Sequence, residues 1–154
     1  MGIRHVIFAI IAGGLLSVSL GACGEDDYLE GSISDELNLD FDELRLHKQG
    51  GFLLVEYVHR TFEASETTCK LAADVTALPE DHAIEGLDFL QRVTLRRSTV
   101  QYSVFPQVRE GKLELKEFEF EHGGSVEGTF YVLFENDLTL EGGFSGKLVE
   151  IQIE

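Results

Sequence analysis

Residues 125–134 read Ser-Val-Glu-Gly-Thr-Phe-Tyr-Val-Leu-Phe, and residues 138–146 read Leu-Thr-Leu-Glu-Gly-Gly-Phe-Ser-Gly. Apolar and polar residues alternate in both runs, the pattern of β-strands with one buried face. The polar residues 135–137 between them predict a three-residue hairpin loop. In that register Phe130 faces Gly142 and Phe144 faces Gly128, so each ring covers backbone that a glycine exposes. We expect both rings on the same buried face.

The same period of two runs through most of the chain after Ser32. Further strands are expected at about 37–46, 52–60, 67–75, 90–105 and 113–121. Slips in the alternation predict β-bulges near 42–43 and 116–117, and Gln49-Gly50-Gly51 predicts a turn. A second hairpin is expected around 106–112, with Val104 facing Leu113. Residues 79–85 suit a turn or two of helix.

These patterns predict an all-β fold, an antiparallel β-sandwich or open barrel of seven to nine strands. At most one short helix is expected, near residues 80–90. The chain has 154 residues, which is enough for one ordinary domain.

The first 22 residues have the composition of a secretory signal peptide. Arg4 supplies a positive start, residues 6–20 are apolar apart from small residues, and no acidic residue precedes Glu25. An apolar run of roughly 15 residues is short for a transmembrane helix, which needs about 20.

The segment Leu20-Gly21-Ala22-Cys23 resembles the lipobox of bacterial lipoproteins, an aliphatic residue and two small residues before a cysteine. The resemblance implies cleavage before Cys23, lipidation of its thiol and acylation of the new amino terminus by a chain such as palmitate. The implied location is the bacterial cell envelope, with the membrane as a partner through the lipid on Cys23. In enterobacterial lipoproteins, an aspartate directly after the lipidated cysteine retains the protein in the inner membrane. Here that position is Gly24, which points to the outer membrane. The alternative is an ordinary signal peptide with a chance cysteine.

The chain therefore divides into a signal peptide (1–22), a lipidated cysteine with an acidic tether (23–31) and a single all-β domain (32–154). The whole chain has 28 acidic and 12 basic residues, a net charge of −16. Loss of Arg4 with the signal peptide leaves 28 acidic and 11 basic residues, or −17. Such a charge argues against nucleic acid as a partner, because phosphate binding needs a basic face.

Candidate chemical groups are scattered. We expect His47 opposite Leu53 and His59 opposite Phe41, so the two histidines should lie far apart. No zinc-ligand motif occurs in the sequence. The acidic residues between 25 and 43 do not have EF-hand spacing, so no metal site is predicted. No nucleophile motif occurs either, so the sequence predicts no catalytic residue and no cofactor.

Two features leave alternatives open. Cys69 alternates with Leu71, Ala73 and Val75, which predicts a buried thiol, although a reactive thiol is the alternative. The basic cluster Arg92, Arg96 and Arg97 is expected to pair with nearby carboxylates on an exposed face, or to bind an anion.

These observations favour a lipid-anchored envelope lipoprotein whose β-domain is a binding or structural module, with an envelope protein as a possible partner. Its composition is similar to that of small acidic β-domains behind a lipobox in uncharacterised lipoproteins, which implies no activity. One alternative is a carrier of small apolar ligands in a barrel cavity; an enzyme is the other.

Overall fold

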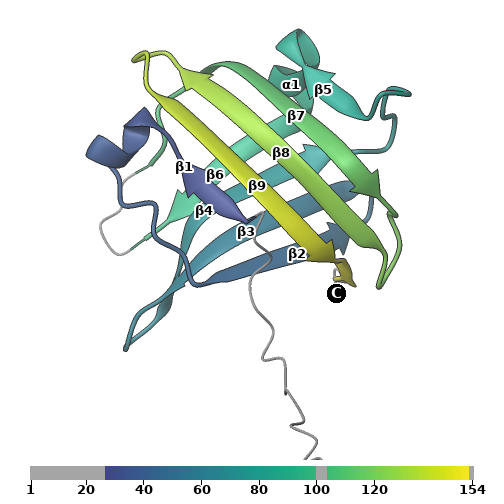
Figure 1. The fold of residues 1–154 in the computed structure, drawn as a ribbon, viewed down its shortest axis with the longest axis horizontal. Helices are drawn as coiled ribbons and strands as arrows, with labels where there is room; N and C mark the ends of the chain where they lie inside the picture. Colours follow the sequence, from purple (N-terminus) through teal and green to yellow (C-terminus); the bar gives the residue numbers. More distant parts are fainter. Residues whose placement is uncertain (1–26, 100–103, 153–154) are drawn as a thin grey trace, which may run out of the picture.

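The computed structural model describes residues 27–99 and 104–152, which form two packed five-stranded sheets. The signal peptide, Cys23 and residues 100–103 lie outside the described residues. The first sheet has the order β1 (Tyr28–Glu30), β9 (Thr139–Lys147), β8 (Ser125–Phe134), β7 (Val108–Phe118) and β5 (Ala83–Glu85). The second has the order β10 (Val149–Glu150), β2 (Glu43–Gln49), β3 (Phe52–Arg60), β4 (Ser65–Asp74) and β6 (Val93–Ser98). Figure 1 shows the strands of one sheet crossing over those of the other.

All neighbouring strands are antiparallel except β10 and β2, which are parallel. The chain passes from the first sheet to the second at Leu148, between β9 and β10. There the backbone N–H of Leu148 donates a hydrogen bond to the carbonyl oxygen of Gly124. This sandwich is not closed into a barrel. The predicted all-β fold is confirmed, with one short α-helix, α1 (Gly86–Arg92), and a 3₁₀ turn, η1 (Ser32–Asp35). Among the described residues, no helix has the length and apolar character needed to cross a membrane.

The predicted β8–β9 hairpin has the expected register. Phe130 pairs with Gly142 and Phe144 with Gly128, and both rings are buried on the inner face. A methyl group on Gly142 would lie 2.5 Å from Phe130 Cε1, and one on Gly128 would lie 2.7 Å from Phe144 Cζ. Each ring therefore occupies the space that a side chain on the facing residue would need.

The core is built from the inward side chains of both sheets. Tyr57 on β3 contacts Phe41 and Phe130 edge to face, with ring centroids 5.0 and 6.3 Å apart. Its hydroxyl donates a 2.8 Å hydrogen bond to the carbonyl oxygen of Gly143 on the opposite sheet. A buried polar group needs such a partner, so this bond fixes how the two sheets sit together.

Three sequence expectations near the amino end are corrected. Tyr28–Glu30 forms β1 against β9, so this part of the expected tether belongs to the folded domain. Residues 37–42 are irregular rather than part of a bulged strand, and Leu39 packs into the core from this segment. β2 begins at Glu43.

The second predicted hairpin is wrong. Leu113 pairs with Phe130 on β8 and with Ile84 on β5, so both edges of β7 are occupied and Val104 cannot be its partner. The bulge near Lys116–Glu117 is present, but it lies against β8. Residues 100–103 of that hairpin lie outside the described residues.

Residues 79–85, where the sequence suggested a helix, form a turn and β5. The helix follows them in the chain. α1 takes up the start of the expected strand at 90–105, and its Phe89 is buried. A side chain on Gly111 of β7 would collide with the Phe89 ring. The missing side chain at Gly111 thus lets α1 dock closely on β7.

Candidate functional site

Two short runs of consecutive apolar residues place apolar side chains on the outer face of the second sheet. In β3, Leu53 and Val55 point into the core, so Phe52 and Leu54 point outward. In the same way Ala72 points outward on β4, between two buried neighbours. Phe52 is 46% exposed, so the outer face of this sheet presents a large apolar side chain to solvent.

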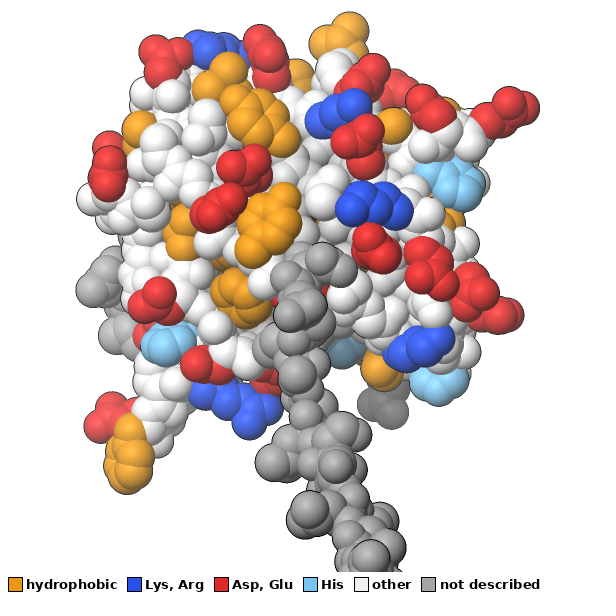
Figure 2. Space-filling view, in the orientation of Figure 1, with side chains coloured by type: hydrophobic (Ala, Val, Ile, Leu, Met, Phe, Trp, Pro, Cys, Tyr) orange, Lys and Arg blue, Asp and Glu red, His pale blue; other side chains and the backbone are white. Residues whose placement is uncertain are grey.

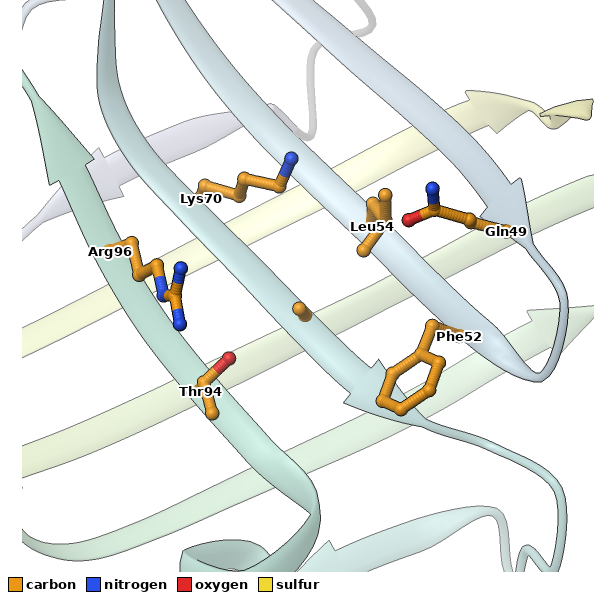
Figure 3. A pocket seen from close by; sticks show the side chains of 7 residues that line it. Gln49, Phe52, Leu54, Lys70, Thr94 and Arg96 are labelled. Atoms are coloured by element: carbon orange, nitrogen blue, oxygen red, sulfur yellow. The ribbon is translucent and has the colours of Figure 1, made fainter. Parts of the chain in front are cut away.

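The register lines these residues up across three strands. Leu54 pairs with Ala72, and Ala72 pairs with Thr94 on β6. Because the side chains of Ala72 and Thr94 are small, the row is hollow beside the larger Leu54. The resulting groove has a volume of about 290 Å³ (Figure 3). We call it the outer groove; its lining residues are Gln49, Phe52, Leu54, Lys70, Ala72, Thr94 and Arg96.

The next row supplies positive charge at one end of the outer groove. Glu56 on β3 pairs with Lys70 on β4, which pairs with Arg96 on β6. Lys70 Nζ lies 2.6 Å from a carboxylate oxygen of Glu56, so part of its charge is already compensated. Arg96 is exposed and has no hydrogen bond or ion pair with any residue in 27–99 or 104–152. Figure 3 shows both basic side chains on the same side of the apolar floor.

The outer groove thus combines an apolar floor with a cation that has no protein partner among the described residues. Its seven lining residues are one amide, one hydroxyl, two basic and three apolar side chains. A ligand that fits carries a negative group beside a small apolar one.

Figure 2 looks onto the outer face of the first sheet, where many acidic side chains lie among fewer basic ones and a group of apolar ones. Glu30 on β1 lies directly opposite Glu141 on β9, a like-charge pair that is unfavourable in a sheet. This part of the first sheet does not favour an anionic ligand.

A charged corner near the start of β2 lies next to the groove face. Glu43 accepts hydrogen bonds from Arg45 Nε at 2.9 Å and from Arg60 Nε at 2.8 Å. These bonds lower the pKa of Glu43 from its usual 4.5 to about 2. They also hold the Arg45 guanidinium at this corner, so Arg45 adds little charge to the outer groove.

This pKa predicts an acid-dependent loss of stability. A group whose pKa is lowered by folding stabilises the protein above its unfolded pKa and stops doing so as pH falls through its folded pKa. We expect Glu43→Gln to lower the free energy of unfolding at pH 7, with the difference from wild type shrinking between pH 4.5 and about 2. Urea denaturation of both proteins across that range measures it. A difference that stays constant down to about pH 2 contradicts the assignment.

The predicted arginine cluster is divided among three places. Arg92 ends α1 and donates to the backbone carbonyls of Asp74 and Ala77. Arg97 donates to the carbonyls of Asn38, at 2.7 Å, and Thr68, which fastens the irregular segment 37–42 to β4. Of the three, Arg96 alone faces the outer groove, because Arg92 belongs to α1 rather than to β6.

The other sequence candidates do not converge. β2 and β3 are joined by a two-residue turn, so His47 pairs with Leu54 rather than Leu53. His59 lies at the far end of β3, with Nδ1 2.8 Å from a carboxylate oxygen of Asp42. Within the described ranges, no group of three His, Cys, Asp or Glu residues is arranged to hold a metal ion.

Cys69 is fully buried on the inner face with Leu71, Ala73 and Val75, as the alternation predicts. Burial raises the pKa of its thiol, although the nearby Arg97 acts in the opposite direction. A thiol that is inaccessible and protonated packs as a small apolar group.

Comparison with known proteins gives no relative: no protein-family model matches the chain, and neither does any curated protein or solved structure.

Proposed function

We propose that this protein is a lipid-anchored binding module of the bacterial cell envelope, and that the outer groove is its binding site. The groove carries this proposal, because it joins an apolar floor to Arg96, a cation that no residue in 27–99 or 104–152 pairs with, on a strongly acidic molecule. The proposed partner is an envelope protein that presents a carboxylate beside a small apolar side chain.

The lipobox-like segment supports a location at the cell envelope. If Cys23 carries the lipid, the four residues 24–27 separate it from β1. They span at most about 14 Å, so the domain is held close to the membrane. With a side-chain charge near −17 after signal cleavage, the domain is repelled by anionic lipid, and its anchoring depends on the acyl chains.

The packing of the interior favours a binding surface over a carrier cavity. Side chains from both sheets fill the space between them, including Tyr57, Phe130, Phe134 and Phe144. The outer groove is open to solvent on the sheet surface, which suits a side chain of a partner protein better than an enclosed apolar molecule.

A labelled peptide tests the binding site. We expect a fluorescein-labelled hexapeptide of alternating glutamate and valine to bind the detergent-solubilised full-length protein. Replacing its glutamates by glutamine removes the charge that Arg96 would meet. A hydrogen bond to a charged group is worth about 1.5–3 kcal/mol, so we expect affinity to fall roughly tenfold or more. Fluorescence anisotropy measures both affinities.

Variants locate the binding. Arg96→Gln is expected to weaken binding of the glutamate peptide about tenfold, and Ala72→Phe, which fills the groove without changing charge, is expected to weaken it as well. Lys116→Gln is the matched control, because Lys116 is an exposed base on the other sheet, 3.3 Å from Glu127. Circular dichroism checks that each variant is folded. Equal affinity for the two peptides, or equal effects of the Arg96 and Lys116 variants, contradicts the proposal.

A further inference from the structure

One long edge of the second sheet has no neighbouring strand. β6 (Val93–Ser98) pairs with β4 along one side, and within residues 27–99 and 104–152 no strand pairs with its other side. Six residues in a strand present an edge about 20 Å long. On such an edge, every second residue directs its backbone N–H and C=O outward, where another extended chain can bond to them.

This edge is also one wall of the outer groove. Two exposed residues of β6, Thr94 and Arg96, line the groove. A strand added beside β6 would continue the rows that run through Ala72 and Lys70. Its alternate side chains would then stand next to Thr94 and Arg96, and a carboxylate in the second row would pair with Arg96 across the strands.

Charge argues for a particular occupant. Arg96 is exposed on the outer face of β6, so two copies of this edge would place like charges on the same face. Each copy also has a side-chain charge near −17 after signal cleavage, which opposes association of the protein with itself. An acidic chain from a different protein is complementary to the β6 edge, whereas a second copy is not.

We propose that the ligand of the outer groove is an extended acidic segment of a partner protein, which binds as an additional strand along β6. Backbone hydrogen bonds to the β6 edge would supply affinity, and a carboxylate opposite Arg96 would supply specificity, as in other cases of strand addition. This inference rests on the proposed function and adds to it the conformation of the ligand and the edge it uses.

N-methylated peptides test the backbone contacts separately from the charge. Two isomers of the glutamate–valine hexapeptide are made, one methylated on the glutamate nitrogens and the other on the valine nitrogens. In an extended strand, each isomer has one edge blocked and the other edge free to hydrogen-bond. A strand that binds β6 in one direction, with its carboxylates toward Arg96, uses one edge only. We therefore expect one isomer to lose at least tenfold in affinity and the other to change less than about threefold.

The outcomes separate the two proposals. Equal affinities of the isomers overturn strand addition, and if Arg96→Gln still weakens binding, the outer groove remains the binding site. If the two isomers differ in affinity but Arg96→Gln changes neither affinity, the peptide binds as a strand elsewhere. That result would overturn the outer groove as the binding site and leave strand addition standing. Dimerisation of the protein in detergent without peptide, measured by sedimentation and abolished by Thr94→Pro, would show that a second copy occupies the edge and would overturn the inference.

Discussion

Replacing Phe130 by alanine is expected to lower the free energy of unfolding by about 3–5 kcal/mol. The Phe130 ring is 2% exposed, contacts Tyr57 edge to face and covers Gly142 on the neighbouring strand. Its loss leaves a cavity in the middle of the sandwich that the surrounding strands cannot close. Equilibrium unfolding in urea measures the change, and Phe130→Leu, which keeps the site apolar, provides a milder variant if the alanine protein does not fold.

A double-mutant cycle tests the ring-over-glycine arrangement itself. In Gly142→Ala the new methyl would lie 2.5 Å from Phe130 Cε1 and 2.9 Å from the Tyr57 hydroxyl oxygen. Overpacking of this kind costs about 1–3 kcal/mol. In the double variant the methyl enters space that the ring has left, so the two losses should be less than additive, by about 0.5–3 kcal/mol.

Tyr131→Ala is the control for that cycle. Tyr131 is the neighbour of Phe130 on β8, but it faces the opposite side of the sheet and is 42% exposed. The losses in unfolding free energy caused by Tyr131→Ala and Gly142→Ala should be additive. Additive losses for Phe130 and Gly142 would contradict the proposed contact between ring and glycine.

Replacing Cys23 by serine is expected to move the protein from the membrane fraction to the soluble fraction completely. Serine lacks the thiol to which the lipid would attach, and the acidic domain has no attraction of its own to an anionic membrane. Two or more acyl chains hold a protein stably, whereas none leaves it free. Fractionation of cells with immunoblotting, together with metabolic labelling by a palmitate analogue, measures both location and lipid.

Cys69→Ala is the matched control, because it removes the other cysteine and leaves the lipobox intact. Cys69 is fully buried, so its loss affects packing without affecting the anchor. This variant should remain labelled and membrane-bound. Retention of Cys23→Ser in the membrane, or labelling of Cys23→Ser by the palmitate analogue, would contradict the anchor.

The sequence predicted the features that depend on neighbouring residues. The β8–β9 hairpin has a short loop and a strict alternation, and its ring-over-glycine pairs leave one register. The Cys69 face of β4 was predicted for the same reason. β7 also alternates clearly, but its partners are β8 and β5, and alternation does not specify which strand lies beside it.

The outer groove depends on register across strands that are distant in sequence. Leu54, Ala72 and Thr94 meet because two separate strand pairings, β3 with β4 and β4 with β6, align them. A turn of two residues rather than three at Gly50-Gly51 shifted every expected pairing of β2 with β3 by one residue. The consecutive apolar residues 52–55 and 71–73 were the available signal, since a strand with one solvated face should alternate.

NMR of the detergent-solubilised full-length protein locates the binding of an acidic ligand on the outer face of the second sheet, through amide chemical shifts followed during titration with the glutamate–valine peptide. We expect the largest shifts at Leu54, Ala72, Thr94 and Arg96, with saturation at one affinity. No comparable shifts are expected at Thr129 on the outer face of the first sheet. Largest shifts on the first sheet, or none on β3, β4 and β6, would contradict binding in the outer groove.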